Sequence, residues 1–202
     1  MKIFSLIFTV FLVFSLEQEL SSQNNKTMEI ATFGSGCFWC TEAIFQHLKG
    51  VESAISGYSG GSVNNPTYKE VCTGETGHAE VIQVTYNPEI ISYTELLEIF
   101  WQTHDPTTLN KQGTDVGTQY RSAIFHHNKL QKELAETYKN KLDKTGIFDN
   151  PIVTEITEYM NFYKAEDYHQ EYYDNNKSQP YCSFVITPKM DKFKKVFKDK
   201  LK

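Results

Sequence analysis

Cys37 and Cys40 stand three positions apart in the run Cys-Phe-Trp-Cys, a spacing that allows thiol chemistry. Cys37 follows Gly34 and Gly36 at the expected start of a helix. There the positive end of the helix dipole and the unpaired backbone donors should favour the thiolate and lower the pKa. Cys40 shares the helix face, which permits a disulfide. The pair predicts a reactive thiol, with a buried apolar cysteine as the alternative.

Other sites that could use these residues fit the sequence poorly. Zinc needs four ligands, and no second ligand pair stands at finger-like spacing. The remaining candidate ligands are Cys72, Cys182, His78 and His169. A dinucleotide fingerprint fails because Phe38 and Trp39 occupy the place of its third glycine. Thioredoxin is the stronger rival, but its aromatic residue precedes the first cysteine, whereas Phe38 and Trp39 lie between the two.

The elements that must position these thiols alternate along the chain. Strands are expected over 29–33, 51–58, 79–86, 120–126 and 152–156, and helices over 37–49, 92–103 and 130–142. Ser92 and Glu95 form a capping box, and Asp105-Pro106 ends that helix. The order strand, helix, strand, strand, helix, strand predicts an α+β fold of the ferredoxin-like (split βαβ) plan. This is a two-layer sandwich, a mixed sheet with helices on one face, and its long loops are expected to be functional.

Composition limits the classes of protein. The 202 residues, 40% hydrophobic and 22% charged, suit one domain with a full core. A net charge of -5 gives no overall field to attract nucleic acid. Four cysteines are too few for a disulfide scaffold in a chain of this length.

The two ends of the chain have sequence patterns that differ from those of its middle. Lys2 and the apolar stretch 3–16 have the form of an export signal, too short for a spanning helix, with cleavage expected before Gln23. A retained anchor or an N-terminal helix of the fold is the alternative. Residues 1–22 are therefore predicted to be a signal peptide and 23–28 a linker. Residues 183–202 are predicted to form a basic amphipathic helix, whose apolar residues are Met190, Phe193, Phe197 and Leu201.

Eight short sequence blocks along the chain are informative when taken together. They are Gly36-Cys37-Phe38-Trp39, Gly57-Tyr58-Ser59-Gly60-Gly61, Asn65-Pro66-Thr67-Tyr68, Val71-Cys72-Thr73-Gly74, Thr76-Gly77-His78-Ala79-Glu80, His104-Asp105-Pro106-Thr107, Asp115-Val116-Gly117-Thr118-Gln119-Tyr120-Arg121-Ser122 and Ala165-Glu166-Asp167-Tyr168-His169-Gln170. In this order they resemble the peptide methionine sulfoxide reductase A family, from about residue 30 to residue 182. The resemblance implies that 29–182 is a catalytic domain of this family.

The resemblance also implies roles for site residues. Reducing a sulfoxide needs a thiolate at sulfur and a proton for the departing oxygen. Cys37 matches the nucleophile and Glu80 the acid, whose pKa desolvation would raise. Tyr68 and Tyr120 match the tyrosines that hold the sulfoxide oxygen. The substrate-binding matches are Phe38 and Trp39, which would bind the S-methyl group, together with Asp115 and His169.

The resulting sulfenic acid needs a second thiol, and two candidates remain. Cys182 matches the usual resolving position of the family, although Pro180 stands where a glycine is common. Cys40 departs from the family pattern and would need no movement of the C-terminal stretch. Cys72 is expected to be structural.

The expected activity is thiol-dependent reduction of methionine-S-sulfoxide, free or in proteins, which repairs proteins under oxidative stress. Electrons would come from thioredoxin or another dithiol, with no metal or other cofactor and no nucleic acid partner. The protein is expected to be an exported monomer, or cytoplasmic if the N-terminal segment is not a signal. The alternatives are a general dithiol oxidoreductase and a non-catalytic module that binds oxidised or methionine-rich segments.

Overall fold

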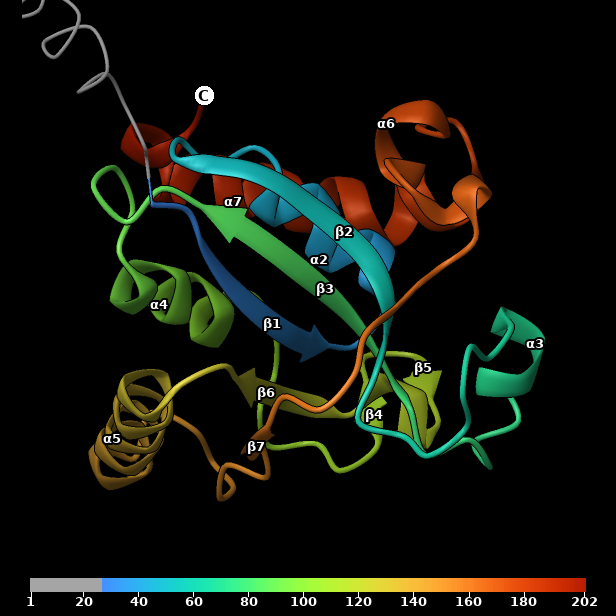
Figure 1. The fold of residues 1–202 in the computed structure, drawn as a ribbon. Helices are drawn as coiled ribbons and strands as arrows, with labels where there is room; N and C mark the ends of the chain where they lie inside the picture. Colours follow the sequence, from blue (N-terminus) through green and yellow to red (C-terminus); the bar gives the residue numbers. More distant parts are fainter. Residues whose placement is uncertain (1–26) are drawn as a thin grey trace, which may run out of the picture.

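A six-stranded mixed sheet forms the centre of the protein; this computed structural model describes residues 27–202 (Figure 1). The strands lie in the order β7-β6-β1-β3-β2-β8. They are β1 (Glu29–Ser35), β2 (Val51–Ser59), β3 (Ala79–Tyr86), β6 (Ser122–His126), β7 (Glu155–Glu158) and β8 (Tyr163–Lys164). Neighbours are antiparallel except β6 and β7, which are parallel. The predicted signal segment 1–22 and most of the predicted linker lie outside the described residues.

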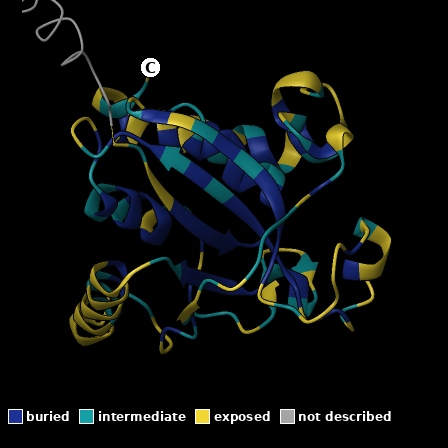
Figure 2. Ribbon diagram, in the orientation of Figure 1, coloured by how far each residue is buried: buried dark blue, intermediate teal, exposed yellow. Residues whose placement is uncertain are grey.

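Four helices share one apolar core cluster with one face of the sheet. They are α2 (Phe38–Phe45), α4 (Tyr93–Thr103), α5 (Lys129–Thr145) and α7 (Thr187–Val196). Side chains alternate along a strand, so Ile82 and Val84 of β3 face these helices. Val81 and Phe125 belong to a smaller cluster that Tyr159 and Phe162 cover. Figure 2 shows the central strands largely buried.

Phe33 lies at the centre of the main core and fixes β1 against two helices. It is fully buried, and its ring lies 5.4 Å from that of Phe45 on α2 and 5.2 Å from that of Phe100 on α4. Such aromatic contacts add to the free energy gained by burying apolar area. Because Cys37 follows β1 directly, this packing holds the reactive segment on a rigid base.

Local sequence signals account for several element boundaries. α4 begins with the predicted capping box: Ser92 accepts a hydrogen bond from the amide of Glu95, whose carboxylate accepts from the amide of Ser92. A second capping box, on Thr67 and Glu70, starts the short helix α3 (Tyr68–Val71), which was not predicted. β3 has its predicted bounds.

α2 ends four residues earlier than the periodicity predicted, because the C-terminus of the chain pairs with the segment after it. The Lys49 amide donates to the carbonyl of Lys200, and the Lys202 amide donates to that of His47. Leu48 forms an isolated bridge with Leu201. Backbone groups that could extend the helix therefore bond to residues some 150 positions later.

Other boundaries also differ from the predictions. Thr118–Tyr120 form a 3₁₀ helix, η1, so β6 starts after it, and β7 starts later than expected. The predicted C-terminal helix is divided into a π-helical segment, η3 (Cys182–Ile186), then α7, and a 3₁₀ turn, η4 (Lys198–Lys200). The unpredicted short elements are β4 (Lys111–Gln112), β5 (Asp115–Val116), η2 (Asp167–His169) and α6 (Tyr172–Asn175). Within residues 27–202, no helix is long and apolar enough to cross a membrane.

Candidate active site

Cys37 stands at the N-cap of α2, immediately after β1 and a sharp turn at Gly36. Gly36 has φ +89°, and a Cβ there would lie 2.5 Å from the side chain of Gln112, so this turn requires glycine. Cys37 is buried, and its carbonyl accepts hydrogen bonds from the amides of Cys40 and Thr41. Its thiol makes no capping hydrogen bond to the helix and is left for chemistry.

Glu80 of β3 lies beside this helix start. The Phe38 amide donates to Glu80 Oε2 at 3.0 Å, which places the carboxyl group next to the residue that follows Cys37. The side chain is 1% exposed. Burial raises the pKa of Glu80 to about 8, with smaller contributions from Asp115 and Cys40, although the Phe38 hydrogen bond acts in the opposite direction. The carboxyl group therefore keeps its proton near neutral pH.

An aromatic wall adjoins the thiol. Trp39 Nε1 donates to His169 Nδ1 at 3.1 Å, and the His169 ring lies 5.0 Å from that of Phe38 and 4.5 Å from that of Tyr68. His169 is buried, and burial lowers its pKa. Since Nδ1 accepts from Trp39, the neutral ring carries its proton on Nε2. His169 thus orients the indole and packs in the wall.

The opposite face of Trp39 packs on Tyr172, which the sequence did not single out. Their rings are stacked at 3.7 Å between centroids and 8° between planes. Glu42 of α2 anchors this part of the chain. The carboxyl group is 1% exposed and interacts with the backbone of Glu171 and Tyr172; burial raises its pKa to about 7. The strained Glu171, with φ 50°, is thereby held between α2 and the start of α6.

Tyr68 and Tyr120 come from the two long loops, on α3 and η1 respectively. Both pack against the main core. Burial raises the pKa of each hydroxyl, and the negative charge of Glu80 raises it further. Cys37 also contributes to the shift at Tyr120. Both hydroxyls stay protonated and are available as hydrogen-bond donors beside Glu80 and Cys37. Glu166 accepts a hydrogen bond from the Tyr68 amide at 2.9 Å and so holds α3 in place. The sequence analysis named this residue only as part of a motif block.

Asp115 reaches the thiols through a residue that the sequence analysis missed. The Tyr181 hydroxyl donates to Asp115 Oδ2 at 2.6 Å and lies 3.9 Å from Cys40 Sγ. It also interacts with the Cys37 thiol. Asp115 sits in the β4–β5 hairpin, 66 positions from Tyr181. No local sequence pattern predicts such a contact. The only indication in the sequence is that Tyr181 precedes Cys182.

All four cysteines are free thiols. The expectation that the helix start lowers the pKa of Cys37 is wrong, because burial raises that pKa well above its ordinary value. The hydrogen bond with Cys37 instead lowers the pKa of Cys40 to about 7. Cys182 is fully buried in η3, and burial raises its pKa. Cys72, expected to be structural, is exposed at the end of α3.

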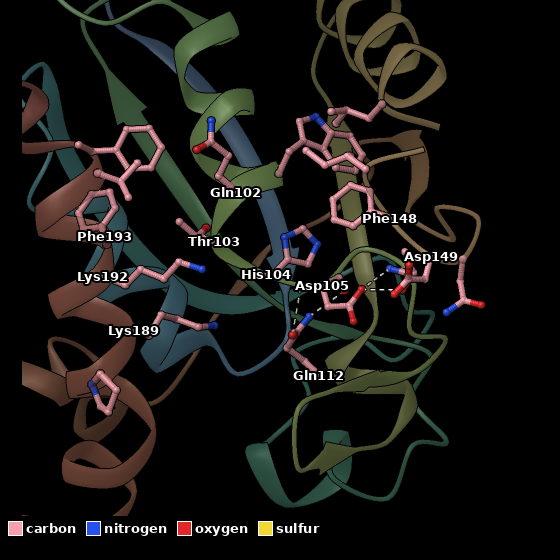
Figure 3. Close-up of a pocket in the computed structure, with 18 residues that line it drawn as sticks. Gln102, Thr103, His104, Asp105, Gln112, Phe148, Asp149, Lys189, Lys192 and Phe193 are labelled. Carbon is pink, nitrogen blue, oxygen red and sulfur yellow. Dashed lines mark hydrogen bonds between the residues drawn. The ribbon is translucent and has the colours of Figure 1, made fainter. Parts of the chain in front are cut away.

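A cavity of about 850 Å³ lies apart from this wall, between α4, α5 and α7 (Figure 3). Figure 3 shows Lys189 and Lys192 pointing from α7 toward His104 and Asp105. None of the site cysteines is among the described residues that line it. Lys189 lines this cavity and its charge helps to lower the pKa of Cys40. In residues 27–202, no group of three or more His, Cys, Asp or Glu side chains is arranged to hold a metal ion.

Comparisons with known proteins agree with this site. The family model described as peptide methionine sulfoxide reductase matches residues 29–201. A peptide methionine sulfoxide reductase MsrA of Sulfolobus acidocaldarius is 57% identical over 177 residues, which cover 86% of this chain and 97% of that protein.

Two solved structures of Mxr1 from Saccharomyces cerevisiae are also similar. The reduced form has a TM-score of 0.72 at 39% identity, covering 77% of this chain and 89% of that one. The complex with Trx2 has a TM-score of 0.52 at 30% identity, covering 72% and 84%. With a family model that spans nearly all the described residues, the chain belongs to the peptide methionine sulfoxide reductase family.

Proposed function

We propose that Cys37 attacks the sulfur of methionine-S-sulfoxide and takes up its oxygen. The observation that carries this assignment is the Glu80 carboxyl group, protonated near neutral pH and bonded to the amide that follows Cys37. Glu80 gives a proton to the sulfoxide oxygen, and the thiol proton of Cys37 restores it. Oxygen moves from one sulfur to the other. The products are methionine and a Cys37 sulfenic acid.

The remaining site residues bind the substrate. The hydroxyls of Tyr68 and Tyr120 donate to the sulfoxide oxygen as charge develops on it. Phe38 and Trp39 form the apolar surface for the S-methyl group, which is supported by the burial of Phe38 and by the packing of the two rings. His169 orients Trp39, and Asp115 supports the site from the β4–β5 hairpin. The preference for the S epimer follows from the family.

Cys40 is the resolving thiol that the contacts favour, with Cys182 as the alternative. Cys40 interacts directly with Cys37 and has the lowered pKa of the pair, whereas burial raises the pKa of Cys182 in η3. The disulfide is then reduced by thioredoxin or another dithiol. The yeast relative solved with Trx2 supports a reductant of this kind. Both thiols that the cycle needs are supplied by the chain, so it uses no metal or other cofactor.

The fold, cellular role and location complete the proposal. The order β1, α2, β2, β3, α4, β6 and the sheet order β6-β1-β3-β2 support a ferredoxin-like plan. The enzyme is proposed to act as a monomer on free and protein-bound methionine sulfoxide and to repair proteins under oxidative stress. The apolar stretch 3–16 supports export. Mass spectrometry of the mature chain tests this, since a first residue other than Gln23 would contradict the proposed cleavage.

The direct test uses separated S and R epimers of a blocked methionine sulfoxide. The full chain is incubated with each epimer and dithiothreitol, and methionine is followed by chromatography. We expect loss of the S epimer alone and no turnover in Cys37→Ser. Reduction of insulin disulfides by the same protein, with neither epimer consumed, would instead favour a general dithiol oxidoreductase. Affinity for oxidised peptides without any consumption of thiols would indicate a binding module.

A further inference from the structure

Tyr181 brings a hydroxyl group to the thiol pair from a distant part of the chain. Its oxygen lies 3.9 Å from Cys40 Sγ, long for a hydrogen bond but within the reach of sulfur, and it also interacts with Cys37. The other partner of this hydroxyl is Asp115 Oδ2, at 2.6 Å. The ring packs edge-on against Trp39, with 5.8 Å between centroids. A single side chain thus connects both thiols to one carboxylate.

The attack on the sulfoxide does not use this arrangement, since Glu80 supplies the acid there. The next reaction has its own proton requirement. When a thiol displaces the hydroxyl group of a sulfenic acid, the thiol must lose a proton and the departing hydroxide must gain one. Glu80 contacts the amide of Phe38, whereas Tyr181 contacts the sulfur of Cys40. Tyr181 is therefore the group placed to take the proton of the Cys40 thiol.

We propose that Tyr181 is a catalytic residue of the resolving step, in which its hydroxyl, held by Asp115, carries the proton of the Cys40 thiol toward the hydroxide that leaves Cys37. This inference rests on the proposed function. As Cys40 attacks, its proton passes to the Tyr181 oxygen and the Tyr181 proton passes to Asp115. The proton then returns from Asp115 through the Tyr181 hydroxyl, which also interacts with Cys37, to the hydroxide, and water leaves.

The atoms and electrons of this step balance. One S–H bond of Cys40 and the S–O bond of Cys37 break, while the S–S bond and one O–H bond form. The Cys40 sulfur is oxidised, and the Cys37 sulfur, already oxidised to a sulfenic acid, is reduced by the same amount. Tyr181 and Asp115 regain their starting states once the proton has been delivered, so no external oxidant or reductant is required.

The same contact bears on the choice between the two resolving thiols. Tyr181 directly precedes Cys182, which is fully buried in η3. As long as Tyr181 bonds to Asp115, the chain next to Cys182 is tied to the β4–β5 hairpin. Cys40 already interacts with Cys37 and needs no change at this bond. Tyr181 therefore favours Cys40 through position as well as through chemistry.

Single-turnover kinetics of Tyr181→Phe test the inference, because the variant keeps the ring and removes the hydroxyl. Excess full-length enzyme without external reductant is mixed with the S epimer, and samples are quenched over time. Methionine reports the first step, and loss of free thiols, with the disulfide mapped by mass spectrometry, reports the second. We expect methionine formation within about twofold of wild type and disulfide formation slowed at least about tenfold.

Two variants make the result specific. Asp115→Asn should also slow the second step, and adding it to Tyr181→Phe should cause little further loss if both act in one proton path. Tyr173→Phe is the matched control, since that hydroxyl bonds to Thr187 instead of a thiol, and it should leave both rates unchanged. If Tyr181→Phe does not fold, as judged by its urea midpoint, Asp115→Asn alone carries the test.

The outcomes separate the two levels of the proposal. If wild type forms no methionine, the proposed function fails. If methionine forms but Tyr181→Phe makes the disulfide at the wild-type rate, only the inference on Tyr181 fails. An equal slowing of both steps would show a structural role and would also overturn it. The inference also fails if the wild-type disulfide maps to Cys37 and Cys182. It fails as well if Cys40→Ser forms a disulfide at the wild-type rate.

Discussion

At the scale of single residues, the site depends on carboxyl groups placed in different surroundings. Burial raises the pKa of Glu80 to about 8, although the amide hydrogen bond from Phe38 acts in the opposite direction. Asp115, on the short β4–β5 hairpin, accepts a hydrogen bond from the Tyr181 hydroxyl. A protonated acid and a carboxyl group that accepts a hydrogen bond from Tyr181 thus occur beside one pair of thiols. This division suits a reaction that needs a proton donor in its first step and a proton acceptor in its second.

The pH dependence of methionine formation should report Glu80. Because the protonated carboxyl group is the active form, the single-turnover rate of wild type should fall as the pH rises through about 8. Glu80→Gln cannot donate the proton, so it should be slower by about 100-fold or more and lack this descending limb. Stopped samples over pH 6–10 measure both. A descending limb that persists in Glu80→Gln would assign it to another group.

Some of these residues were predictable and others were not. Cys37, Glu80, Tyr68 and Tyr120 stand in motif blocks, so a resemblance can identify them one by one. Tyr181, by contrast, contacts a residue 66 positions away, and its place before Cys182 does not predict that contact. The pKa of Cys37 was also misjudged, since the helix position is visible in sequence while the extent of burial is not.

At the scale of elements, α2 holds two parts of the site together. Its first residues carry the thiols and the aromatic wall, and Glu42 in its middle holds the start of α6. The carboxyl group reaches the backbone of Glu171 and Tyr172, and Tyr172 stacks on Trp39. One short helix thereby carries the indole of Trp39 and holds the tyrosine that stacks on it.

Glu42 should make stability depend on pH in a defined window. Its pKa is raised from 4.5 to about 7 in the folded protein, so the folded state binds more protons than the unfolded state between these values. The stability contribution is complete below about 4.5 and is lost as the pH rises through 7. Glu42→Gln removes the titration.

Urea unfolding of both proteins at pH 5, 6, 7 and 8 checks this. The free energy of unfolding of wild type should fall relative to Glu42→Gln by up to roughly 1.4 kcal/mol per pH unit, then level off above pH 7. Glu52→Gln, at an exposed position of β2, serves as the control. Parallel curves for wild type and Glu42→Gln would mean that Glu42 does not titrate in this window.

Element bounds were predictable where the signal is local. The capping box of α4 and the alternation of β3 gave correct bounds because each reflects contacts between near neighbours. The end of α2 was missed because residues 47–49 pair with residues 200–202 instead of continuing the helix. The hairpin β4–β5 was also missed, since two-residue strands carry too few positions for a pattern.

At the scale of the whole molecule, the last five residues pair with the segment that follows α2. Leu201 bridges Leu48, and Lys200 pairs with Glu95 at the start of α4. This ion pair is partly exposed and contributes little by itself. The backbone bonds to His47 and Lys49 are the firmer part of the connection. The sequence predicted an apolar helical face here but not the segment it would reach.

Removing residues 198–202 should therefore weaken the fold without affecting catalysis. Two backbone hydrogen bonds, each contributing about 1 kcal/mol, suggest a loss of roughly 2 kcal/mol in the free energy of unfolding. Urea denaturation measures this, and the S-epimer assay should give the wild-type rate at 25 °C because the thiols lie at the other end of α2. Lys198→Ala, with the chain left intact, is the control and should change neither. A truncated protein as stable as wild type would contradict a stabilising role for this pairing.

The direction of β1 has a practical consequence. The strand enters the molecule at Glu29 and delivers Cys37 just beyond its far end (Figure 1). Seven extended residues span roughly 23 Å. A bead, electrode or fusion partner joined ahead of Glu29 would thus be attached on the side opposite to the thiol. Immobilised in this orientation, the enzyme should keep its catalytic face open to large oxidised proteins, which favours N-terminal over surface-lysine coupling for a sulfoxide-removing column.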